Sequence, residues 1–174
     1  GYSADDAMAV LAHYVNYLDE YHSMDAPMAA ATTELLKAKI EALSAITSEN
    51  TPAEIDAAIL EAQTLLVVVD ASVKNYEKLY AAIENHWISA DEFSHMPGVG
   101  DYTDYIQEVE DGYYDGAYSD DQIETIIASL DDALENCKKS EILVGKDITY
   151  IIKNPSFEDW TTTQNNDTSG GVEN

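Results

Sequence analysis

The chain has 174 residues, of which 45% are hydrophobic, and its 34 acidic and eight basic residues give a formal net charge of −26. Every basic residue is lysine, so the chain lacks the bidentate guanidinium group that many phosphate and carboxylate sites use. A charge of this sign repels phosphate backbones, which argues against a nucleic-acid partner. No stretch approaches the roughly 18 consecutive apolar residues of a membrane span, so we expect no membrane insertion of this segment.

The first half of the chain has the apolar spacing of three amphipathic helices, which we expect over 3–21, 27–46 and 52–86. The third helix has the clearest start, because Thr51 and Glu54 form a capping box around a proline. Its apolar residues then recur at alternating intervals of four and three from Ile55 to Tyr80 and Ile83, which is a heptad seam. A straight helix of this length would be roughly 50 Å long, so we expect it to belong to more than one helical bundle.

The second half of the chain continues with an irregular segment and two further helices. The segment 87–101 contains a proline and two glycines, which predicts a loop. We expect a helix over 102–113, and the acidic run at 119–122 supplies a second capping box for a helix whose apolar seam reaches Cys137. Cys137 is the only cysteine and lies on that seam, so we expect a buried thiol instead of a nucleophile or a disulfide.

The two halves of the chain match each other at an offset of 68 residues. Segments 51–66 and 119–134 share the capping box and the apolar positions that follow it. We therefore expect two tandem three-helix modules, 1–70 and 71–140, in an elongated all-α array that shares the helix over 52–86. The alternative is that any two amphipathic helices align this well by their pattern alone.

This order of elements resembles the FIVAR-type modules, three-helix units that recur in bacterial surface proteins and carbohydrate-active enzymes. The likeness covers 3–138 and rests on the sequences TPAEI at 51–55 and SDDQI at 119–123. Tyr102 fits an aromatic position that the family often has in the second helix, whereas Leu36 departs from it in the first repeat. The resemblance implies a non-enzymatic spacer or adhesion role, without catalytic residues, in a larger secreted or cell-surface protein.

The end of the chain has a different character. The run 147–152 has strand composition. The segment 147–160 resembles the opening strand of a carbohydrate-binding β-sandwich, with Asn154, Phe157 and Glu158 in the pattern that follows this strand. In such modules the glutamate region often contributes to a structural calcium site, which makes Glu158 a conditional candidate. A sandwich needs many more strands, so we expect 141–174 to be a short strand segment with a polar tail, the truncated start of a further domain.

Metal-binding and catalytic patterns are incomplete throughout the chain. The acid-rich segment 111–122 has the spacing of an EF-hand loop, but Tyr113 and Gln122 stand where two calcium ligands belong, which favours a solvated loop. Glu92 and His95 supply two ligands where zinc needs three or four. Because carboxylate pairs are unavoidable among 34 acids, they carry no catalytic information, and we expect no enzyme, no cofactor and no metal site.

Aromatic residues cluster around the predicted loops of the second repeat and are the candidate ligand-binding residues. They are Trp87, Phe93, Tyr113, Tyr114 and Tyr118. Exposed aromatic rings stack on sugars or serve as hot spots at protein interfaces, but they also pack loops onto the ends of helical bundles. The leading hypothesis is a helical spacer or adhesion segment associated with glycan binding or degradation. The alternative is a module that binds a glycan or a surface protein through these aromatics.

Overall fold

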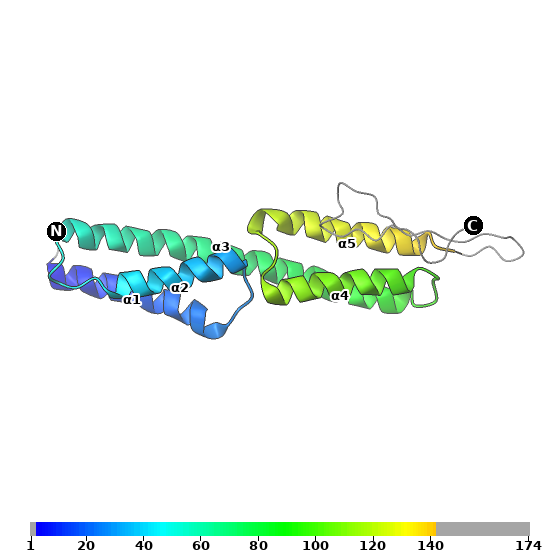
Figure 1. Cartoon of the computed structure of the whole chain (residues 1–174), viewed down its shortest axis with the longest axis horizontal. Helices are drawn as coiled ribbons and strands as arrows, with labels where there is room; N and C mark the ends of the chain where they lie inside the picture. The colour runs from blue at the N-terminus through cyan, green and yellow to red at the C-terminus, as the bar shows by residue number, and fades with distance from the viewer. Residues whose placement is uncertain (1–2, 142–174) are drawn as a thin grey trace, which may run out of the picture. The chain divides into compact units, whose positions relative to one another are not determined.

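A computed structural model describes residues 3–141, and all of the regular structure in this range is helical (Figure 1). The helices are α1 (Ala4–Met24), α2 (Ala30–Ser44), α3 (Pro52–Glu92), α4 (Val99–Asp115), the short 3₁₀ helix η1 (Asp120–Gln122) and α5 (Ile123–Lys138). The predicted all-α class is confirmed for this part of the chain. The predicted strand over 147–160 and the calcium candidate Glu158 lie outside the described residues.

The predicted capping box at the start of α3 is confirmed at atomic detail, and α1 begins with the same arrangement. At the start of α1, Ser3 Oγ accepts from the Asp6 amide at 3.2 Å and the Ser3 amide donates to the Asp6 carboxylate at 3.2 Å. At the start of α3, the Thr51 amide donates to Glu54 Oε1 at 2.9 Å and the Glu54 amide donates to Thr51 Oγ1 at 3.2 Å. Each pair satisfies two amides that have no partner within the helix, which fixes where the helix begins.

Helix boundaries differ from the prediction in the second half of the chain. The predicted end of α3 at residue 86 is wrong, because the helix continues to Glu92. Residues 87–92 contain neither proline nor glycine, so nothing in them interrupts the backbone hydrogen bonds, and the first proline comes later at Pro97. The predicted loop is therefore confined to the residues between α3 and α4.

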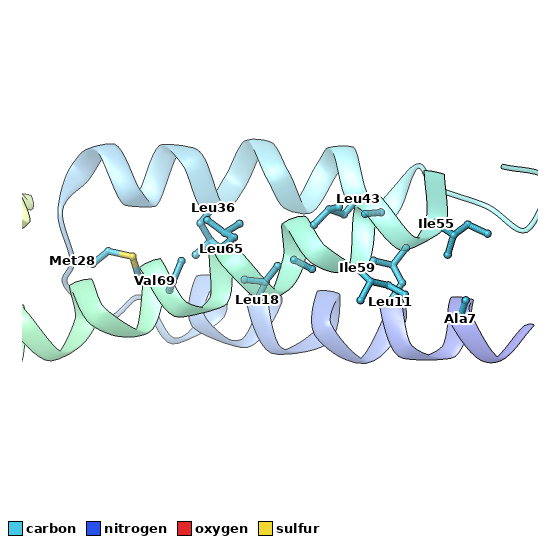
Figure 2. Packing of buried hydrophobic residues seen from close by; sticks show 12 residues of the cluster. Ala7, Leu11, Leu18, Met28, Leu36, Leu43, Ile55, Ile59, Leu65 and Val69 are labelled. Atoms are coloured by element: carbon cyan, nitrogen blue, oxygen red, sulfur yellow. The ribbon is translucent and has the colours of Figure 1, made fainter. Parts of the chain in front are cut away.

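The chain divides into two compact units, of which unit 1 is Gly1–Tyr76 with Asp115–Asp120 and unit 2 is Glu77–Tyr114 with Asp121–Asn174. In unit 1 the core is aliphatic and lies between α1, α2 and the first part of α3 (Figure 2). Its buried residues are Ala7, Leu11, Leu18, Met28, Leu36, Leu43, Ile55, Ala58, Ile59, Ala62, Leu65 and Val69. Burying each leucine or isoleucine contributes about 1.5–3 kcal/mol relative to leaving it exposed, so these contacts hold the three helices together.

The segment Asp115–Asp120 belongs to unit 1 through hydrogen bonds and one close backbone approach. The Ala30 amide, at the start of α2, donates to the carbonyl of Gly116 at 2.8 Å. Gly116 has φ +66°, and a Cβ atom there would lie 2.5 Å from the carbonyl oxygen of Met28. Both the positive φ and the short distance require glycine at this position.

Unit 2 is built from the C-terminal part of α3 with α4 and α5, and its core is richer in aromatic and polar groups. Its buried side chains include Leu79, Ile83, His86, Tyr102, Tyr105, Ile106, Val109, Ile123, Ile126, Ser129, Leu130, Ala133 and Cys137. Cys137 is buried as predicted, and burial raises the pKa of its thiol. The predicted heptad seam places Tyr80 in the core, but the structure buries Leu79 there and exposes Tyr80.

We predict that Gly116→Ala lowers the free energy of unfolding by about 1–3 kcal/mol, because alanine is strained at this φ and its Cβ would meet backbone atoms. Gly100→Ala is the matched control, since a Cβ on Gly100 has nothing within 4 Å and lies within α4. Alanine should stabilise that helix by up to about 1 kcal/mol. Urea denaturation followed by circular dichroism measures both changes, and equal midpoints for the two variants would contradict the requirement for glycine at 116.

Candidate functional site

The five predicted aromatic residues do not form one site. Tyr118 belongs to unit 1, whereas Trp87, Phe93, Tyr113 and Tyr114 belong to unit 2. Tyr118 is half-buried, and its backbone is held by Tyr76 of unit 1. The Tyr76 hydroxyl donates to the Tyr118 carbonyl at 2.5 Å, and the Tyr118 amide donates to that hydroxyl at 3.0 Å. The Tyr118 backbone therefore fixes a loop in unit 1.

The ring of Phe93 makes contacts with other side chains of the chain. The ammonium group of Lys138 lies 5.4 Å from the centroid of the Phe93 ring, within the range of a cation–π contact. His95 lies beside the same ring, with 6.5 Å between the two centroids. These contacts tie the loop after α3 to the end of α5, so we assign Phe93 to packing.

Trp87, Tyr113 and Tyr114 are brought together on one surface with residues that the sequence analysis did not select. Tyr80, Glu84 and Trp87 follow each other on α3 at intervals of four and three, which places them on one face of the helix. Glu110, Tyr113 and Tyr114 lie on α4. We call these six residues the aromatic surface of unit 2.

Contacts between the two helices join the members of the aromatic surface. The Trp87 indole N–H donates to Glu110 Oε1 at 2.6 Å. The rings of Tyr80 and Tyr113 have centroids 5.3 Å apart, and those of Tyr113 and Tyr114 are 4.9 Å apart. Tyr113 is buried beneath the surface, whereas Tyr80 and Tyr114 are 38% and 62% exposed. The arrangement presents open tyrosine rings on a fixed base.

The electrostatic environment of the aromatic surface is negative. The carboxylate of Glu84 is the largest cause that raises the pKa of the exposed Tyr80 phenol, and the Glu110 carboxylate adds to it. The pKa of Tyr113 is also raised, mainly by burial, with a further contribution from Glu77. A carboxylate disfavours the phenolate through like-charge repulsion, so the raised pKa of Tyr80 reports acidic groups close to its ring.

A second polar cluster lies inside unit 2 around His86, whose side chain is only 6% exposed. His86 Nδ1 lies 2.5 Å from the Tyr102 hydroxyl oxygen, and Nε2 lies 2.9 Å from Asp131 Oδ1. This geometry fits a neutral imidazole whose Nε2–H donates to Asp131 and whose Nδ1 accepts from the tyrosine hydroxyl. Burial lowers the pKa of His86, and the hydrogen bond and charge of Asp131 oppose that shift in part.

The His86 cluster joins α3, α4 and α5 but leaves its reactive groups enclosed. Tyr102 is buried, and burial strongly raises the pKa of its phenol. The Cys137 thiol, which as a thiolate would raise the pKa of Tyr102 further, is buried as well. Since no substrate reaches either group in this arrangement, we interpret the cluster as a device that fixes the helices of unit 2.

Between residues 3 and 141 no three histidine, cysteine, aspartate or glutamate side chains gather in a way that could hold a metal ion. None of the helices in that range combines the length and the apolar character that crossing a bilayer demands.

Comparisons of the chain with protein families, with curated proteins and with solved structures return no match. The resemblance to FIVAR-type modules therefore stays a prediction.

We predict that His86 makes unit 2 less stable in mild acid. Its folded pKa lies below the usual 6.5. The unfolded chain therefore binds the proton more readily than the folded chain. The contribution of His86 to stability is complete above the usual pKa of 6.5, and it is lost as the pH falls from there through the lower folded pKa. Thermal unfolding at a series of pH values should show a larger acid-side loss for the native chain than for His86→Leu.

The exposed His22 supplies the control for this measurement, because His22→Gln removes an imidazole from the end of α1 without touching the cluster. The control should keep the acid-side loss of the native chain. An identical pH dependence for His86→Leu and the native chain would contradict the prediction, because it would show that folding leaves the pKa of His86 unchanged.

Proposed function

We propose that the chain is a non-enzymatic helical spacer or adhesion segment of a larger secreted or cell-surface protein. In this proposal two tandem three-helix modules share α3, which is the third helix of the first module and the first helix of the second. The observation that carries it is a repeat in the pattern of buried residues at 68-residue intervals.

Six of the eight buried positions of α3 within unit 1 have buried counterparts in unit 2. The six are Ile55, Ala58, Ala62, Leu65, Val69 and Ser72. Sixty-eight residues further along the chain stand Ile123, Ile126, Leu130, Ala133, Cys137 and Ser140, which are also buried. Ile59 corresponds to the half-buried Ile127, and the counterpart of Tyr76 lies outside the described residues. Apolar periodicity alone explains some of this agreement, because every amphipathic helix buries one stripe. It does not explain the buried serine at the end of each series.

The two buried serines make the same hydrogen bond. Ser72 Oγ accepts from the Ala29 amide at 3.0 Å, directly before the start of α2. Ser140 Oγ accepts from the Gly98 amide at 2.9 Å, directly before the start of α4. A buried amide must find a partner, so each serine fixes the start of the module's second helix. This shared detail supports a duplicated module over a coincidence of patterns.

The continuity of α3 supports a shared helix. It runs for 41 residues from Pro52 to Glu92, which corresponds to about 60 Å if it is straight. The core positions Leu11 and Leu18 of α1 have buried counterparts 68 residues later, at Leu79 and His86 of α3. The C-terminal part of α3 therefore matches the first helix of a second module. Repeats that share cores only with their neighbours are suited to holding other domains apart.

We predict that Ser72→Ala and Ser140→Ala each lower the free energy of unfolding by about 1–3 kcal/mol, because each leaves a buried amide without its acceptor. Ser44→Ala, at the exposed end of α2, should change it by less than about 0.5 kcal/mol. Chemical denaturation of the three variants measures the costs. A cost for only one of the two buried serines would count against equivalent modules.

Small-angle X-ray scattering tests the spacer itself. A compact single domain of this length has a radius of gyration of about 16 Å, and a tandem array with a shared long helix should give a clearly larger value. A value at the compact expectation would refute the array. The same measurement on the Gly116→Ala and Gly100→Ala variants shows whether a larger radius of gyration comes from unfolding or from a changed arrangement of folded helices.

A second candidate function is favoured by the aromatic surface of unit 2. Exposed tyrosine rings beside a tryptophan that is fixed by Glu110 are typical of surfaces that bind sugars or proteins. A spacer of this kind would also hold a partner, either a glycan or another surface protein, through its second module.

A further inference from the structure

We propose that the aromatic surface of unit 2 binds a basic peptide segment, taking lysine or arginine side chains against its tyrosine rings and between its carboxylates. This inference rests on the second candidate function, and it names the class of ligand for that surface.

The rings of the surface are presented in a way that suits a cation. Tyr80 and Tyr114 come from two different helices and flank the buried Tyr113, so their positions are set by helix packing. Trp87 is fixed because its indole N–H, its sole polar hydrogen, is held by Glu110 at 2.6 Å. A cation placed over such rings is attracted by their quadrupoles without the cost of ordering them first.

The carboxylates around the rings lack an internal cation. In the part of unit 2 that the structure describes, Lys78 pairs with Glu124 and Lys138 pairs with Glu135. Neither these bonds nor any other ion pair found between residues 3 and 141 reaches Glu84 or Glu110. At Phe93, by contrast, the chain places Lys138 over the ring. The aromatic surface therefore has aromatic rings and carboxylates, but no lysine of the described residues forms an ion pair with Glu84 or Glu110. A bound ligand would supply the cation that Lys138 supplies at Phe93.

Charge complementarity favours a basic peptide over a neutral glycan. A sugar gains from stacking on tyrosine but gains little from nearby carboxylate charge, whereas an ammonium or guanidinium group gains from both. The net charge of −26 also attracts a basic partner from a distance and raises its rate of association. A peptide that carries several such groups can contact Tyr80 and Tyr114 together.

The experiment is a titration of the 174-residue chain, at about 0.15 M salt, with a short peptide in which glycine alternates with lysine and arginine. The same peptide with acetylated lysine and citrulline tests the charge, and neutral oligosaccharides test the other ligand class. Because any polycation is attracted to this chain, matched variants locate the contact. Tyr114→Ala is compared with Tyr17→Ala on α1, and Glu110→Gln is compared with Asp132→Asn on α5.

We expect the basic peptide to bind and its uncharged counterpart to fail. Tyr114→Ala should weaken binding about threefold, and Glu110→Gln should weaken it about twofold, while the two control variants keep the native affinity. Equal weakening by Glu110→Gln and Asp132→Asn, with no effect of Tyr114→Ala, would overturn the site in favour of general attraction.

The oligosaccharide titration separates this inference from the function on which it rests. Binding of oligosaccharide with loss in Tyr114→Ala, and no binding of the basic peptide, would overturn the ligand class while leaving a binding surface in place. An absence of binding for every probe would overturn both.

Discussion

The uninterrupted backbone of α3 is the constraint on which the rest of this structure depends. The helix contains no proline after its first residue and no glycine, so its hydrogen-bond ladder continues through residues that belong to both compact units. One stripe of it supplies Ile55, Ala62 and Val69 to the core of unit 1. A later stretch supplies Leu79, Ile83 and His86 to the core of unit 2. Both compact units therefore contain buried residues of α3.

Buried polar groups give the two units their specific geometry. A serine in each unit accepts the amide that precedes the second helix of that unit, and a helix start fixed in this way cannot slide along its neighbour. Unit 2 adds Tyr105, whose hydroxyl lies 2.6 Å from Ser129 Oγ, and the cluster around His86. Aliphatic contacts stabilise many arrangements of helices, whereas a satisfied buried hydrogen bond stabilises one. The units are therefore similar in pattern and different in chemistry.

The two units differ in the chemistry of their buried residues. Unit 1 buries mainly aliphatic side chains such as Leu18, whereas unit 2 also buries His86, Tyr102 and Tyr105. Large aromatic residues in the core of unit 2 continue outward into the aromatic surface, where Tyr113 lies beneath Tyr80 and Tyr114. Of the two units, the second therefore offers the rings and carboxylates that a ligand could use.

The sequence by itself determined the helical class, the capping box of α3, the burial of Cys137 and the internal match at 68 residues. These features depend on neighbours in the chain or on a single period, so local chemistry is sufficient to reveal them. The sequence pattern placed Tyr80 in the core, which is wrong. Leu79 and Tyr80 are neighbours at the edge of the heptad seam, and only the packing of the helices decides which of the two is buried.

Only the tertiary structure decided the composition of the candidate site. It separated Tyr118 and Phe93 from the other aromatics and joined Trp87 to Glu110 and Tyr80 to Tyr113. The spacing of Tyr80, Glu84 and Trp87 was visible in the sequence as one helical face. Its partners on α4 were not, since they lie more than twenty residues away along the chain and meet α3 only through the packing of two helices.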